Sequence, residues 1–233
     1  MSDYIQNLFA ERIGGSSFSI KGSLYKFEKI KQACREIERT HLDTPIIDLG
    51  LGKPDWMADS LVIDTFYSEA KKSKITVDDD NVILAFQKAA VQYMDKVYGV
   101  SGLDSGQLKA MQYAGIKALE HPEITEKTNM KYSRRHNLLV NALSAVGFTV
   151  IKPKAGLYLY TKIPKGVEGG ETFKNAEHFA QWLIKEKQIS VVPWDDVGHY
   201  VRISVTFIAN TETEELSLVQ EIQKRLSGVR FLW

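Results

Sequence analysis

One arginine stands out as a residue that could bind a charged ligand. Arg202 lies within Tyr200-Val-Arg-Ile-Ser-Val205, a stretch whose apolar residues alternate as in a β-strand. If those apolar residues face the core, Arg202 lies on the opposite face of the strand. A guanidinium is suited to holding a carboxylate through two parallel hydrogen bonds. On composition alone, an exposed arginine without such a role is the commoner case.

Candidates for metal binding and nucleophilic catalysis are weak. The run Asp78-Asp-Asp-Asn81 begins like a calcium loop, but Ile83 and Ala89 stand where an EF-hand needs Gly and Glu. No P-loop, G-x-G-x-x-G or G-x-S-x-G motif occurs. The single cysteine, Cys34, excludes an internal disulfide and a cysteine-based zinc site. We expect no metal, and surface or structural roles for the histidines, which are His41, His121, His136, His178 and His199.

Helices and strands interleave along the chain, which predicts an α/β or α+β fold. Apolar periodicity predicts helices over residues 1–13, 25–40, 60–72, 83–98, 107–119, 122–146, 175–187 and 211–226. Gly147 is a natural end for the long helix, and Asn175 a natural N-cap for the helix after it. Strands are expected over 45–50, 148–152, 157–162, 189–192 and 201–207.

Composition narrows the class of protein. The 233 residues carry 30 Lys+Arg and 29 Asp+Glu, and 44% are hydrophobic, as in a globular protein. The net charge of +1 argues against a nucleic-acid module, which usually presents a basic face. No apolar run approaches the ~18–20 residues that span a bilayer. The polar N-terminus is unlike a secretory signal, so we expect a cytoplasmic protein that binds neither nucleic acid nor membrane.

Several segments together resemble one family, the LL-diaminopimelate aminotransferases. These are pyridoxal-phosphate enzymes of the class I/II aminotransferases, with fold type I. The resemblance follows the family order over nearly all of residues 1–233. It is carried by residues 1–15 and 25–31, Ile47-Asp-Leu-Gly-Leu-Gly-Lys-Pro-Asp55, Gln92-Tyr-Met-Asp-Lys-Val-Tyr-Gly99, Asp104-Ser-Gly-Gln107, Ala114-Gly-Ile116, His121-Pro-Glu-Ile-Thr-Glu126, Tyr132-Ser-Arg-Arg135, Val192-Pro-Trp-Asp-Asp196 and Tyr200-Val-Arg-Ile-Ser-Val-Thr-Phe207.

The resemblance is interrupted near Ser101–Ser105, where the sequence passes from the family's N-terminal part to its C-terminal part. In the family, the missing stretch supplies the phosphate loop, a P-N-N-P-T-G segment, the Asp for the pyridinium nitrogen and a Ser-x-Ser-Lys segment with the Schiff-base lysine. The only Ser-Lys dipeptide here, Ser73-Lys74, lacks that context. We therefore expect no catalytic and no cofactor-binding residue, and no bound pyridoxal phosphate.

Some substrate-side positions survive. The resemblance carries Arg202 onto the arginine that grips the substrate α-carboxylate, which reverses the expectation from composition. It carries Tyr25 and Gly52 onto substrate-contacting positions near the N-terminus. Two departures accompany them. Asp78 lies where the family has a phosphate-binding tyrosine, and Lys53 replaces the usual acidic residue of G-x-G-E-P-D.

The resemblance implies a remnant of fold type I, an α+β small domain whose large-domain sheet is mostly absent. We expect an N-terminal arm and small-domain segment over 1–59, residual large-domain helices and the deletion seam over 60–104, and the C-terminal small domain over 105–233. The apolar side chains Phe86, Tyr93 and Val97 would then lose their cover, which predicts exposed patches and self-association.

The functional hypothesis is a truncated homologue of the enzyme that moves an amino group between LL-diaminopimelate and 2-oxoglutarate. That reaction belongs to lysine and cell-wall precursor synthesis. Without the lysine segment, the chain is expected to be inactive alone, although a dicarboxylic amino acid could still bind. Two alternatives stay open. One is a non-catalytic module that forms a homodimer or pairs with a full-length paralogue. The other is a gene-model artefact of an active enzyme.

Overall fold

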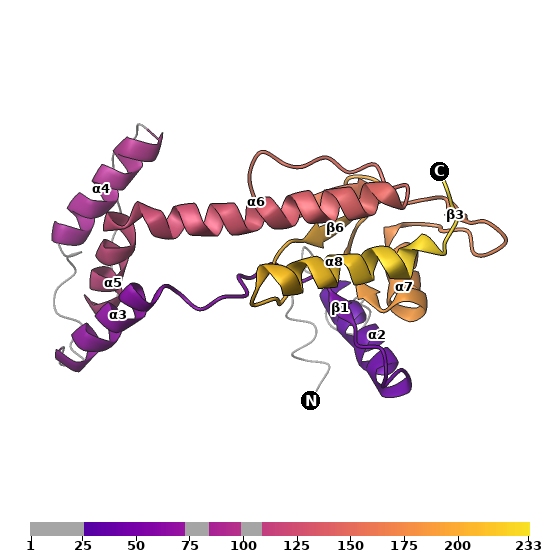
Figure 1. Ribbon diagram of the computed structural model, residues 1–233, viewed down its shortest axis with the longest axis horizontal. Helices are drawn as coiled ribbons and strands as arrows, with labels where there is room; N and C mark the ends of the chain where they lie inside the picture. Colours follow the sequence, from indigo (N-terminus) through magenta and orange to yellow (C-terminus); the bar gives the residue numbers. More distant parts are fainter. Residues whose placement is uncertain (1–25, 73–83, 99–108) are drawn as a thin grey trace, which may run out of the picture. The chain divides into compact units, whose positions relative to one another are not determined.

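The chain forms two compact units. The computed structural model describes residues 26–72, 84–98 and 109–233 (Figure 1). Unit 1 combines the described residues up to Lys53 with Arg135–Trp233, and unit 2 runs from Pro54 to Arg134. Residues 109–134 group with the segment that begins at Pro54. The long helix α6 (Pro122–Ala145) continues from one unit into the other.

Unit 1 holds all the strands of the described residues. In chain order, its elements besides α6 are α2 (Lys26–Thr40), β1 (Ile47–Asp48), β2 (Tyr158–Lys162), β3 (Gly166–Val167), α7 (Ala176–Lys187), β4 (Ile189–Ser190), β5 (Val192–Trp194), β6 (Tyr200–Ser204), α8 (Glu212–Ser227) and β7 (Phe231–Leu232). Helices and strands interleave, as the sequence predicts. The fold is a mixed α/β arrangement.

The sheets of unit 1 are small. β6 lies between β2 and β5, antiparallel to both, and pairs Arg202 with Tyr160 on one side and Val192 on the other. β1 pairs in parallel with β4, so the segment before Gly50 lies beside Ser190. β3 pairs with β7, a strand that the sequence did not predict. The pairings of β1 with β4 and of β2 with β6 bring together residues about 40 to 140 positions apart in the chain.

The helices of unit 1 are fixed by caps and by one buried face. Asn175 caps α7 by accepting a hydrogen bond from the His178 N–H at 2.8 Å, as expected. Thr211 caps α8 in the same way. The core between these helices and the sheets contains fully buried Leu139, Leu159 and Phe179. Burying such side chains contributes roughly 1.5–3 kcal/mol each.

Unit 2 contains no strand among its described residues. Its helices are α3 (Ser60–Lys72), α4 (Leu84–Tyr98), α5 (Lys109–Glu120) and the first part of α6. α5 packs against both α3 and α4. The Phe86 ring lies against Gly115, where a Cβ would come within 2.7 Å of it. Phe86 and Tyr93 are half-buried, whereas Val97 remains 48% exposed.

One strand expected from the sequence does not form, and two further expectations concern residues outside the described part of the chain. Residues 148–152 do not form a strand, because the Phe148 N–H donates back to Leu143 O and Thr149 O accepts from the Thr161 hydroxyl instead of joining a backbone ladder. The helix over 1–13 and the turn at Asp78 lie outside the described residues. No helix in the described parts of the chain is both long and apolar enough to cross a membrane.

Candidate functional site

The site is built around Arg202 on the central strand. Val201 and Ile203, its neighbours along β6, are buried in the core at 1% and 3% exposure. Arg202 is half-buried and points to the other face of the sheet, as the alternation in the sequence predicts. Neighbouring strands on both sides hold this backbone in place, so the position of the arginine is set by the sheet and not by a loop.

Aromatic rings surround the guanidinium. The Arg202 Cζ lies 4.2 Å from the centre of the Tyr158 ring, 5.4 Å from that of Trp194 and 5.7 Å from that of Phe27. Its Nη2 donates a 3.1 Å hydrogen bond to Gly50 O. Arginine stacks well on aromatic faces, and the planar group keeps its donor edge available. The buried Nε has no hydrogen-bond partner in the described part of the chain.

Gly52 lies against the same tyrosine. A Cβ at this position would come within 1.8 Å of the Tyr158 hydroxyl oxygen, so nothing larger than glycine fits there unless the tyrosine moves. The Tyr158 hydroxyl also lies 3.5 Å from Gly52 O. Tyr158 therefore joins two residues predicted from the sequence, Arg202 and Gly52. The third, Tyr25, lies outside the described residues.

The charged groups beside this cluster are engaged with one another. The Lys26 Nζ lies 3.8 Å from the centre of the Trp194 ring and 3.4 Å from an Asp196 carboxylate oxygen. Burial tends to raise the pKa of Asp195, but hydrogen bonds from the Ala176 N–H and from His199 outweigh it and lower that pKa. Asp195 therefore carries a negative charge at neutral pH and binds the N-terminus of α7.

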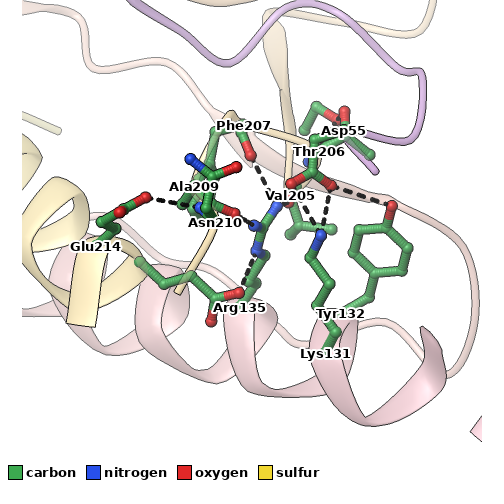
Figure 2. A network of polar contacts seen from close by, with 12 residues as sticks. Asp55, Lys131, Tyr132, Arg135, Val205, Thr206, Phe207, Ala209, Asn210 and Glu214 are labelled. Atoms are coloured by element: carbon green, nitrogen blue, oxygen red, sulfur yellow. Dashed lines mark hydrogen bonds and ion pairs between the residues drawn. The ribbon is translucent and has the colours of Figure 1, made fainter. Parts of the chain in front are cut away.

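Two segments that carry the family resemblance have structural roles (Figure 2). Within unit 2, Lys131 Nζ lies 2.8 Å from both Asp55 carboxylate oxygens, and the side chains are only 3% and 1% exposed. Within unit 1, the fully buried Arg135 donates from Nε to Glu215 at 2.8 Å. Its other nitrogens donate to the carbonyls of Val205, Phe207 and Ala209. Sequence reasoning missed both ion pairs, because their partners are 76 and 80 residues apart.

The histidines and carboxylates of the described residues do not form a metal site. No three His, Cys, Asp or Glu side chains cluster there closely enough to hold an ion. His121, His178 and His199 each pair with a carboxylate, and the buried His136 contacts Gly156 O at 3.1 Å. These are surface and structural roles.

The chain belongs to the aminotransferase class I and II family, whose model matches residues 82–221. It is similar to the LL-diaminopimelate aminotransferase of Methanocaldococcus jannaschii, with 28% identity over 414 aligned positions that span 98% of this chain and 99% of the relative. The enzyme of the same name from Methanococcus maripaludis is 26% identical over 415 positions and the full length of both. That of Halothermothrix orenii is 36% identical over 138 positions, 56% of this chain and 32% of the relative.

Solved structures show the same fold at low identity. The aspartate aminotransferase of Rhizobium meliloti matches with a TM-score of 0.71 at 13% identity, over 95% of this chain and 99% of that one. The substrate-bound BacF structure from Bacillus subtilis matches with a TM-score of 0.65 at 13% identity, over 96% of this chain and 97% of that one. The chain therefore has a partial fold of the aminotransferase type.

The cofactor of this family, pyridoxal phosphate, needs an amine for its covalent link and N–H groups for its phosphate. Among the described residues, N–H groups at the N-termini of α3, α7 and α8 already bind the chain's own Asp59, Asn175 and Thr211. The amine of the buried Lys131 is bound by Asp55. These residues do not fit the cofactor.

Proposed function

We propose that the chain is a shortened homologue of LL-diaminopimelate aminotransferase that has lost amino transfer. It keeps a carboxylate site, formed by Arg202 and the aromatic rings around it. The observation that carries the proposal is the Arg202 guanidinium, which is held on three aromatic rings with its buried Nε left without a partner among the described residues. A carboxylate is the group best matched to those donors. The retained function is binding, through Arg202, Gly52 and Tyr25, of a dicarboxylic amino acid.

Two observations support the loss of chemistry. The alignments with the two archaeal enzymes run over 414 and 415 positions, whereas this chain has 233 residues, so a long stretch of each relative has no counterpart here. Lys131 is the buried lysine among the described residues, and its amine is bound by Asp55. Pyridoxal phosphate supplies the electron sink of amino transfer, and without it the side chains of this protein have no route to that reaction.

Calorimetry tests the binding. Glutamate and diaminopimelate are titrated into wild-type protein, Arg202→Gln and Arg230→Gln. Arg230 is the matched control, because its side chain is 85% exposed and pairs only with Glu168 in the described residues. We expect Arg202→Gln to weaken binding roughly tenfold or more, the value of a charge-assisted hydrogen bond. Arg230→Gln should bind as wild type. No heat with either ligand, or equal affinity in Arg202→Gln, would overturn the proposal.

A separate experiment tests the absence of catalysis. The purified protein is incubated with pyridoxal phosphate, treated with borohydride and digested for mass spectrometry. Glutamate-dependent turnover is measured in parallel. We expect no reduced cofactor on any lysine and no turnover. A stoichiometric adduct on one lysine would contradict inactivity while leaving the assignment of Arg202 untouched.

A second candidate function is pairing with a full-length aminotransferase. The helices of unit 2 leave several large apolar side chains exposed, which favours association. They are Leu61, Ile63, Phe66, Tyr67, Val97 and Met111. Co-expression with a full-length paralogue, followed by purification through a tag on this chain, tests it. We expect a 1:1 complex that Phe66→Lys weakens and that Leu42→Lys, at an exposed apolar residue of unit 1, does not. Recovery of this chain alone would refute pairing.

The gene-model alternative is tested at the locus. Sequencing the transcript across codons 99–107 distinguishes a continuous reading frame from one that retains the missing middle. A longer transcript that retains the missing middle would mean that the true protein is a full-length enzyme. The proposal of a shortened homologue would then be wrong.

A further inference from the structure

A recess of about 220 Å³ lies between α2 and the ends of β1 and β4. Its walls are largely apolar, and several polar and charged side chains also line it. The lining includes Phe27, Ile30, Cys34, Asp48, Ser190 and Val192. Arg202 is not part of the lining, although Phe27 and Gly50 contact both regions. The recess lies within unit 1 and is distinct from the carboxylate site.

The deepest polar group of the recess is the Ser190 hydroxyl. Ser190 is 1% exposed, and the neighbour of its Oγ is the Cys34 thiol, which is only a weak hydrogen-bonding group, so no strong hydrogen-bond partner is present in the described residues. A buried hydroxyl without a strong partner loses free energy, so a ligand that bonds to it gains. The parallel pairing of β1 with β4 places Ser190 directly beside Asp48.

A carboxylate lies next to that hydroxyl. Gly50 donates its N–H to an Asp48 carboxylate oxygen at 2.8 Å, which fixes the side chain against the recess. A Cβ added at Gly50 would lie 3.2 Å from this Asp48 oxygen and 3.5 Å from Ser190 Oγ. Asp48, Gly50 and Ser190 all line the recess, so a hydroxyl and a carboxylate border the same space.

We propose that this recess binds the ammonium end of a small alkylamine. An ammonium group has three N–H donors, which suit the acceptors on Ser190 and Asp48. The alkyl chain would lie along Phe27, Ile30 and Val192 in the remaining volume. The exposed Lys31, Arg35 and Glu38 also line the recess and together carry one net positive charge, which disfavours a second ammonium group, so the ligand class is a monoamine. This site does not depend on the proposed function.

The thiol of Cys34 serves as a reporter. Burial raises its pKa, the Ser190 hydroxyl lowers it, and the Asp48 and Glu38 carboxylates raise it further, so the net change is upward. A raised pKa makes the thiol a slow nucleophile. Because the chain has one cysteine, alkylation by iodoacetamide reports on this recess alone.

The experiment measures the rate of Cys34 alkylation in the full chain at neutral pH, with n-pentylamine or n-pentanol at equal ionic strength. We expect saturable slowing by both, with pentylamine binding roughly two- to fivefold more tightly, since Asp48 is solvent-exposed and its attraction is screened. No saturable protection by pentylamine would overturn the proposal, and so would equal protection by the alcohol.

Variants distinguish the contribution of the Asp48 carboxylate to binding from that of the Ser190 hydroxyl. Asp48→Asn keeps an oxygen for the Gly50 N–H and should remove the preference for the amine. Asp43→Asn, an exposed carboxylate outside the recess, should leave it unchanged. Ser190→Ala should weaken protection by both probes while the protein stays folded. If Asp43→Asn and Asp48→Asn behave alike, the effect is general electrostatics and the site is refuted.

Discussion

At the scale of single residues, the carboxylate site depends on side chains that come from distant parts of the chain. Arg202 could be recognised in the sequence from strand alternation and from the family resemblance. Tyr158 could not, because its contact with both Arg202 and Gly52 exists only once β2 pairs with β6 in the observed register. Trp194 and Phe27 join the site in the same way, from β5 and α2.

Gly52 gives a steric prediction. Gly52→Ala places a methyl group 1.8 Å from the Tyr158 hydroxyl oxygen, so we expect a loss of about 1–3 kcal/mol in the free energy of unfolding. Gly228→Ala is the matched control, because no atom lies within 4 Å of its added Cβ and its φ is −82°. That change should stay within about 1 kcal/mol of wild type. Urea unfolding measures both. Equal stabilities would mean that Tyr158 is not held at Gly52.

His136 gives a prediction about pH. Burial lowers its pKa, which outweighs the hydrogen bond to Gly156 O. The unfolded state, with the ordinary pKa of about 6.5, therefore takes up the proton first as the pH falls. Stability is then fully present above pH 6.5 and declines below it, towards the lowered pKa of the folded state. Thermal melts from pH 7.5 to 5 should show this decline.

His136→Gln should flatten that profile, because glutamine does not titrate and can still reach Gly156 O. His41→Gln is the control, since His41 is exposed. A wild-type slope that survives in His136→Gln would assign the pH dependence to other groups.

At the scale of elements, periodicity and caps predicted the helices well. The helices over 25–40, 60–72, 83–98, 175–187 and 211–226 form within about one residue of the expected bounds. The expected strand over 148–152 does not form, because Thr149 O accepts from the Thr161 hydroxyl, a tertiary contact that local pattern does not reveal. Phe148 packs edge-on against Phe231 and Trp233, about 5.1 Å between ring centres. Phe231 belongs to β7, a strand that the sequence did not predict, and Trp233 follows it directly.

The helices should differ in local stability. α3 has no buried residue, whereas α7 buries five, among them Phe179 and Ile184. Few buried contacts permit local opening at low free energy. Hydrogen–deuterium exchange read by mass spectrometry should therefore label α3 well before α7. Equal protection at low protein concentration would contradict this. Protection of α3 that appears only at high concentration would instead identify that helix as a self-association surface.

At the scale of the whole molecule, Arg135 connects the C-terminal half of α6 to the segment 205–215. Its guanidinium is fully buried and bonded to Glu215 and to three carbonyls. Removing one partner of a buried pair leaves the other charge uncompensated, so Arg135→Met should cost about 3–5 kcal/mol. Arg230→Met, at an exposed pair, should cost at most about 1 kcal/mol. Chemical denaturation compares them. Similar losses would refute a central role for Arg135.

The arrangement at Arg135 also has a consequence for biosynthesis. The acceptors of its guanidinium follow it by 70 to 80 residues, and Glu215 is the last of them to be made. A ribosome must therefore extend the chain past residue 215, and then by the length of its exit tunnel, before the Arg135 guanidinium can pair with the Glu215 carboxylate. Until then the long helix emerges with an incomplete core, and a chain stalled before that point is a natural client for chaperones.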